Sequence, residues 1–136
     1  MLLVVDANVL FSAIIARGKT CDLIFCEWLQ LIVPEFLFME LEEHKEEIIA
    51  KSSLSEDDFV EFVNSLKERI DVIPRQEFER FLQEANRISP DPDDTEYFAL
   101  ALKFGAVLWS NEKRLKKQPK VTVFSTSDLI SFLSGI

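Results

Sequence analysis

Four acidic residues that are far apart in the sequence occupy positions where a carboxylate can take part in chemistry: Asp6, Glu40, Asp94 and Glu112. If they converge, each pair about 5 Å apart repels by about 3 kcal/mol at an effective dielectric constant of 20. Such a cluster has to take up protons or bind a cation. A ligand set made only of oxygen suits Mg²⁺ or Mn²⁺ better than zinc.

Asp6 directly follows the apolar run Leu2–Val5, whose length and lack of alternation predict a strand buried on both faces. Polar groups at the carboxyl end of such a strand lie at the edge where α/β proteins bind ligands. Asp6 can equally be a polar residue that only closes the strand. Asn8 precedes an apolar helical pattern and is expected to cap that helix.

The other three acids each have a structural explanation as well. Glu40 falls within the apolar stripe of a predicted helix, where a carboxylate is costly unless it is paired or metal-bound. Asp94 lies in the first turn of a predicted helix, where its charge interacts favourably with the helix dipole. Asp93 and Glu96 have the spacing of a capping box. Glu112 follows another apolar run. We interpret His44, on the same helix as Glu40, as a hydrogen-bonded core residue outside the site.

Strand patterns alternate with helical patterns along the chain, which predicts an α/β fold with a parallel sheet and right-handed crossovers in a single domain, residues 1–136. Strands are expected at 2–5, 31–33, 70–73, 106–109 and 121–124. Helices are expected at 9–16, 20–29, 35–50, 55–69, 76–87 and 95–104, and from about 126 to 133.

The composition narrows the function classes. A net charge of −9 and a pI near 4.6 argue against general nucleic-acid affinity, although a local basic cluster can override the total. None of the three glycines forms a dinucleotide or P-loop motif. The sequence shows no signal peptide and no apolar run of membrane-spanning length, and the spacing of its two cysteines fits neither a metal site nor a redox pair. These features favour a cytoplasmic protein. Twelve phenylalanines predict an apolar face that forms a homodimer.

Taken together, the motifs resemble those of the PIN-domain family, and the resemblance covers nearly the whole chain. The opening motif corresponds to Val4-Val5-Asp6-Ala7-Asn8 and the second to Glu40-Leu41. The third corresponds to Asp94 with small residues downstream, and the fourth to Ser110-Asn111-Glu112. The family usually has Asp where Glu112 stands, and often a further acid where Arg114 stands.

This resemblance implies a three-layer α/β/α fold around a mostly parallel five-stranded sheet. It also implies an endoribonuclease that uses Mg²⁺ or Mn²⁺, held by Asp6, Glu40, Asp94 and Glu112 as the catalytic acids. Asn8 and Ser110 would orient these groups or the substrate. Lys113, Arg114, Lys116 and Lys117 would contact RNA, single-stranded or structured. Members of the family often act as toxins, so an antitoxin protein is a further expected partner.

Three other readings stay open. The first is a PIN-like module that binds RNA or protein without cutting, favoured by Glu112 and Arg114. The second is a phosphotransferase with Asp6 as nucleophile, but such enzymes have a second Asp at the position of Asn8. The third is a receiver-like domain, but such domains have an acidic pair at the end of the first strand, where Asp6 stands alone. We rank the receiver-like reading last.

Overall fold

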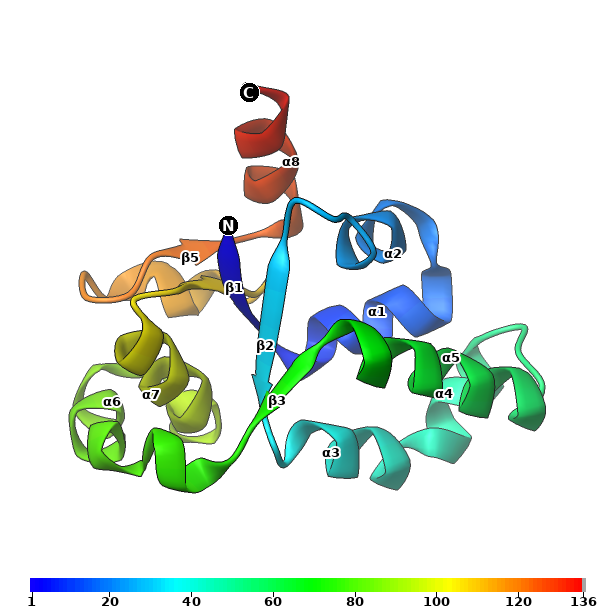
Figure 1. Ribbon diagram of the computed structural model, residues 1–136, viewed down its shortest axis with the longest axis horizontal. Helices are drawn as coiled ribbons and strands as arrows, with labels where there is room; N and C mark the ends of the chain where they lie inside the picture. The colour runs from blue at the N-terminus through cyan, green and yellow to red at the C-terminus, as the bar shows by residue number, and fades with distance from the viewer. Residues whose placement is uncertain (136) are drawn as a thin grey trace.

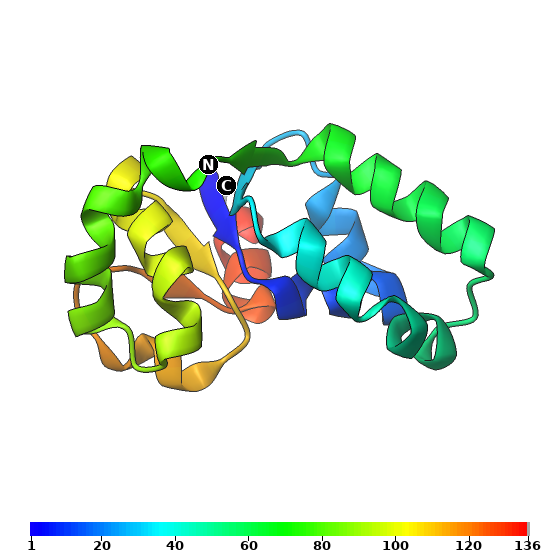
Figure 2. The same cartoon turned by 90° about the horizontal axis from the view of Figure 1, so that it is seen from below.

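The computed structural model describes residues 1–135, and within them the core is a five-stranded parallel sheet (Figures 1 and 2). The strand order is β3-β2-β1-β4-β5, and all four strand pairs are parallel. The strands are β1 (Leu2–Val5), β2 (Gln30–Pro34), β3 (Asp71–Ile73), β4 (Val107–Trp109) and β5 (Val123–Phe124). The predicted α/β fold with its five-stranded sheet is confirmed.

Helices cover both sides of this sheet, which gives three layers. Helices α6 and α7 lie on one side and α1, α3, α4 and α5 on the other, as Figures 1 and 2 show. Their bounds are α1 (Ala7–Ala16), α2 (Gly18–Ile24), α3 (Leu37–Glu43), α4 (Lys45–Lys51), α5 (Glu56–Arg69), α6 (Leu82–Ile88), α7 (Thr95–Phe104) and α8 (Thr126–Ser134). No helix of the described chain combines the length and apolar character needed to cross a bilayer.

The central strand β1 is buried because helices pack on both faces of the sheet. Leu3, Val4 and Val5 have no exposed surface, as expected for an apolar run without alternation. Trp109 of β4 is also fully buried, and its indole N–H donates to Thr126 Oγ1 at 3.0 Å. This rigid middle of the sheet holds the ends of β1 and β4 in place.

Several predicted helices are shorter than their patterns indicated. The helix expected at 35–50 is two helices, α3 and α4, that meet at His44. Each half packs against α1, and α4 also packs against α5, so tertiary contacts decide the break that periodicity did not show. The helix expected at 20–29 ends at Ile24, and 76–87 begins as two 3₁₀ turns. The last strand is confined to Val123–Phe124.

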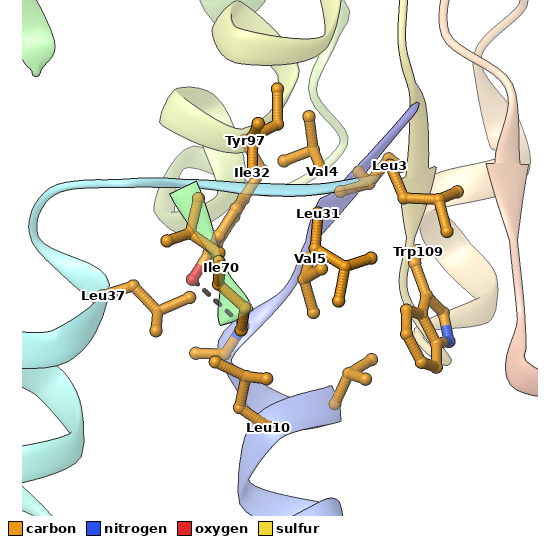
Figure 3. Close-up of a cluster of buried hydrophobic side chains, with 14 of the residues drawn as sticks. Leu3, Val4, Val5, Leu10, Leu31, Ile32, Leu37, Ile70, Tyr97 and Trp109 are labelled. Atoms are coloured by element: carbon orange, nitrogen blue, oxygen red, sulfur yellow. Dashed lines mark hydrogen bonds between the residues drawn. The ribbon is translucent and has the colours of Figure 1, made fainter. Parts of the chain in front are cut away.

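Tyr97 of α7 connects the two helical layers, because it forms a hydrogen bond with the first residue of α1 at the carboxyl end of β1. Its hydroxyl oxygen accepts a hydrogen bond from the backbone N–H of Ala7 at 3.1 Å, and its side chain is 3% exposed. Figure 3 shows Tyr97 among the buried apolar side chains, with this bond drawn as a dashed line. Ala7 is the first residue of α1, so its N–H has no partner within the helix. The phenol therefore satisfies a buried donor at the point where β1 becomes α1.

We predict that Tyr97→Phe lowers the free energy of unfolding by about 1–3 kcal/mol, because the buried Ala7 N–H loses its acceptor while the ring is kept. Urea denaturation followed by circular dichroism measures this change. An unchanged midpoint would show that the N–H finds another acceptor.

Candidate functional site

The site begins where the chain order of the sheet reverses. Strands β2 and β3 extend the sheet on one side of β1, whereas β4 and β5 extend it on the other side. The carboxyl ends of strands on either side of such a switch point are where α/β proteins bind ligands. Val5 pairs with Trp109 in the parallel register, so the residues that follow them, Asp6 and Ser110, lie side by side.

Asp6 is held by bonds from both neighbouring segments. Ser110 Oγ donates to Asp6 Oδ2 at 2.7 Å, and the backbone N–H of Asn8 donates to Asp6 Oδ1 at 3.2 Å. Asp6 is therefore the N-cap of α1, and the expectation that Asn8 caps this helix is wrong. Asn8 is the second residue of the helix and is exposed. The structure thus gives Ser110, rather than Asn8, the side-chain contact with the carboxylate.

The environment of Asp6 makes its negative charge more costly than in water. Burial raises the pKa of this carboxyl above its ordinary value, and the nearby Glu112 carboxylate adds to the increase. The hydrogen bond from Ser110 opposes the shift, since it stabilises the charged form. A buried carboxylate with another acid as its charged neighbour is a site that a cation would stabilise.

Asp94 lies at the start of α7, after the acidic loop. The expected capping box between Asp93 and Glu96 is absent; instead Asp91 accepts from the backbone N–H of Asp93 at 2.9 Å and caps a 3₁₀ turn, Pro92–Asp94. The Asp94 side chain makes no capping bond. Burial, together with the charges of Asp6 and Asp91, raises the pKa of Asp94 to about 7, and Arg114 opposes this.

Glu40 comes from α3, on the opposite helical layer from Asp94. It is half-buried, whereas its helix neighbours Leu37 and Leu41 are fully buried. Burial raises the pKa of Glu40 above its ordinary value, His44 opposes the increase, and the charge of Asp6 adds to it. Glu40 and Asp6 are therefore close enough for each charge to disfavour the other.

The three carboxylates of Asp6, Glu40 and Asp94 line one cleft of about 990 Å³. The cleft runs from the start of α7 past the ends of β1 and α3, and then between α1 and α4. Its lining residues are Asp6, Ala7, Asn8, Phe11, Ser12, Ile15, Phe36, Glu40, His44, Glu47, Ile48, Lys51, Asp93, Asp94, Glu96 and Tyr97. Segments that are distant in sequence thus place their acids on a shared surface.

Glu112 is not part of this lining. Its backbone N–H donates to Ser110 Oγ at 3.1 Å, but its carboxylate is 44% exposed and pairs with Arg114 at 3.5 Å. The basic segment Lys113–Lys117 forms a 3₁₀ helix in which Arg114 also pairs with Asp91, and Lys116 pairs with Asp128. Lys113 and Lys117 are exposed. Two of the four predicted RNA-contacting cations are therefore engaged within the protein.

The donor chemistry of the cleft fits a hard divalent cation. Asp6, Glu40 and Asp94 offer carboxylate oxygens, and burial together with the charge of Asp6 raises the pKa of both Glu40 and Asp94. Among residues 1–135, however, no three Asp, Glu, His or Cys side chains lie close enough together to hold one metal ion. The acids share a cleft and an electrostatic environment, and they are not arranged as a closed set of ligands.

Two cleft residues were missed by sequence reasoning. Tyr97 follows Asp94 by three positions on α7, a spacing that places both on one helical face, and it is the only tyrosine beside twelve phenylalanines. His44 was interpreted as a core residue, but its side chain is 48% exposed and lines the cleft. It follows Glu40 by four positions, so the same spacing rule was available for it.

The raised pKa of Asp94 predicts how stability depends on pH. Between its ordinary value of 3.8 and about 7, the folded protein binds more protons than the unfolded chain, so this residue makes the free energy of unfolding fall as pH rises. At pH 8 without metal, Asp94→Asn should stabilise the protein by about 1–2 kcal/mol after solvent screening of a half-buried group. The gain should vanish near pH 4.

Thermal unfolding in EDTA at pH 4 and pH 8 measures this difference, and a rise of about 4–8 °C is expected at pH 8. Asp22→Asn, at an exposed position of α2 outside the cleft lining, is the matched control. A lower melting temperature for Asp94→Asn at pH 8 would mean that the carboxylate stabilises α7 instead of repelling Asp6.

Comparison with known proteins agrees with this geometry. A family model described as PIN domain matches residues 4–122, whereas no curated protein matches the chain. The crystal structure of VapBC2 from Rickettsia felis, bound to a DNA fragment from their promoter, is similar at a TM-score of 0.66 and 13% identity. That match covers 92% of this chain and 98% of that one.

Two further structures have similar folds. The crystal structure of PAE2754 from Pyrobaculum aerophilum matches at a TM-score of 0.66 and 15% identity, over 100% of this chain and 91% of that one. The structure of VapBC-1 from nontypeable Haemophilus influenzae matches at a TM-score of 0.64 and 15% identity, over 93% of this chain and 99% of that one. At such identities these structures show the fold alone. Because the family model spans most of the chain, this protein belongs to the PIN-domain family.

Proposed function

We propose that this protein is a metal-dependent endoribonuclease that hydrolyses RNA phosphodiester bonds in the cleft at the end of β1 and β4. The observation that supports it is the convergence of Asp6, Glu40 and Asp94 on one cleft, where burial and the charge of Asp6 raise the pKa of Glu40 and Asp94. Uncompensated carboxylates at such a place cost stability, so a function that uses a cation explains their presence. Membership of the PIN-domain family supports the same activity.

One or two of the carboxylates of Asp6, Glu40 and Asp94 would hold Mg²⁺ or Mn²⁺, with water molecules as the remaining ligands. Glu112 would add negative charge at the rim. When bound, such an ion supplies an activated water and stabilises negative charge on the phosphodiester. Ser110 orients the Asp6 carboxylate by its 2.7 Å hydrogen bond. Asn8 would contact substrate, a role supported by its exposure in the cleft lining.

Tyr97 would act as a neutral hydrogen-bond donor in this cleft. Burial and the charges of Asp6 and Glu40 raise the pKa of its phenol above the ordinary value, so the hydroxyl keeps its proton. Because the phenol oxygen accepts from Ala7, its own hydrogen is directed to another acceptor. A substrate or carboxylate oxygen in the acidic cleft is such an acceptor.

We also propose that the protein works as a single domain in the cytoplasm, forms a homodimer, and serves as the toxin of a toxin–antitoxin pair. Two of the similar structures carry the VapBC name, which supports a protein partner. A second candidate function is a PIN-like module that binds RNA or protein without cutting. The exposed, ion-paired Glu112 favours it, since this acid does not line the cleft.

Asp6→Asn and Asp94→Asn should each reduce Mn²⁺-dependent cleavage of single-stranded RNA by at least about a hundredfold, because each removes a carboxylate that can hold the metal ion. Cleavage of a fluorescent RNA in Mn²⁺, Mg²⁺ and EDTA measures this. Asp22→Asn is the control, since it makes the same charge change at an exposed position of α2 outside the cleft lining. Activity that persists in EDTA, or in both ligand variants, would contradict the proposal.

Lys113→Glu combined with Lys117→Glu should weaken RNA binding and reduce the slope of log K against log salt by about 1.4, because two phosphate contacts to a single strand are lost. Lys19→Glu with Lys67→Glu changes the net charge equally on other helices and serves as control. A slope equal to the wild-type slope would assign Lys113 and Lys117 to ordinary solvated surface.

A further inference from the structure

The cleft continues beyond the acids into a groove between α1 and α4. Four α4 residues that line it, His44 at the helix cap and Glu47, Ile48 and Lys51 within, are spaced three or four apart and share one helical face. Residues Phe11, Ser12 and Ile15 of α1 line the other wall. Phe11 is four residues from Ala7, so it lies about 6 Å along the helix from the acidic end. A neighbouring nucleotide of a bound strand can bridge that distance.

An aromatic pair lies at the middle of this groove. The rings of Phe11 and His44 contact each other with centroids 5.4 Å apart and planes inclined by 59°. This distance leaves no room for a third ring between them. Phe11 is half-buried and the His44 side chain is 48% exposed, so the imidazole contacts Phe11 while about half of the side chain stays accessible to a ligand.

The imidazole is also held through its edge. His44 Nδ1 lies 3.3 Å from Glu47 Oε2, and the other oxygen of Glu47 accepts from Lys51 Nζ at 2.8 Å. The ring therefore has two contacts, one with an aromatic ring and one with a carboxylate that is itself paired. A partly exposed ring with such contacts is suited to stacking, because it loses less side-chain entropy on binding than an unrestrained ring does.

The charge of the cleft favours a base over a phosphate at this point. Its lining holds the acids Asp6, Glu40, Glu47, Asp93, Asp94 and Glu96, with Lys51 as the only lysine or arginine. A phosphate in the groove would meet these carboxylates, whereas a nucleobase is uncharged and presents a π-face. Duplex RNA keeps its base faces stacked inside the helix, so only an unpaired base can reach the imidazole.

We propose that the accessible part of the His44 imidazole, in contact with Phe11, stacks an unpaired nucleobase next to the bond that is cut, so that the substrate is RNA that is single-stranded at this position. The inference rests on the proposed nuclease function and adds a base-binding subsite to it. His44 contacts the base and takes no part in bond cleavage.

The test uses the full-length protein in an Asp94→Asn background, which on the proposed function binds RNA without turnover. A short single-stranded RNA carries the fluorescent base 2-aminopurine at each position in turn, since stacking quenches its emission. His44→Ala should raise Kd about tenfold and abolish the quenching, as loss of one base stack does. His44→Phe keeps a stacking face and should restore both within about twofold.

Phe25→Ala is the matched control, because Phe25 forms a similar ring pair with Phe62 at 6.2 Å, away from the cleft lining. It should leave affinity and quenching unchanged. A duplex of the same sequence should bind at least about tenfold more weakly than the single strand. Wild-type behaviour of His44→Ala, failure of His44→Phe to restore quenching, or equal binding of the duplex would each overturn the subsite.

The two proposals fail separately in this design. Quenching that depends on His44, in a protein whose unsubstituted form cuts no RNA in Mn²⁺ or Mg²⁺, refutes the nuclease and supports base binding. Metal-dependent cleavage that is the same with and without the His44 imidazole refutes the subsite and supports the nuclease. Absence of RNA binding in every metal condition overturns both.

Discussion

The parallel pairing of β1 with β4 is the constraint on which the candidate site depends. Because Val5 lies opposite Trp109, the two strands end at the same level and bring Asp6 beside Ser110 across 104 positions of sequence. The reversal of strand order at this pair leaves the edge open to ligands, as it does in other α/β sheets. Burial by helices on both sides then removes water from Asp6, which makes each neighbouring negative charge more costly.

Two helices bring further acids to this edge, one from each layer. Helix α7 starts at Asp94 and is tied to α1 by the bond between Tyr97 and Ala7, while α3 carries Glu40 on the opposite layer. Neither acid stabilises the metal-free protein at neutral pH, because burial and the charge of Asp6 raise the pKa of both. A protein that keeps such a cluster gives up some stability for binding or catalysis. In contrast to these uncompensated acids, the basic segment Lys113–Lys117 has part of its charge compensated, because Arg114 and Lys116 pair with carboxylates.

Sequence reasoning was most successful where a single residue pattern has a single physical outcome. The apolar run before Asp6 had to be a buried strand, and the alternation of strands with helices had to produce a parallel sheet. It was wrong where two local explanations competed. Asn8 and Asp6 are both good N-cap residues, and the strand register selected Asp6 because its carboxylate also receives the Ser110 hydroxyl. The spacing of Asp93 and Glu96 fits a capping box, but Asp91 caps the turn instead.

The sequence by itself determined the order of the elements, the buried central strand and the identity of three acids that meet in one cleft. These follow from hydrophobic periodicity and from the rule that parallel strands end at a common edge. Only the tertiary structure decided that Glu112 turns to Arg114 outside the cleft and that the helix after Pro34 breaks at His44. It also placed Tyr97 and His44 in the cleft wall. Side-chain direction and helix breaks depend on which neighbours pack against each residue, and those neighbours are distant in the chain.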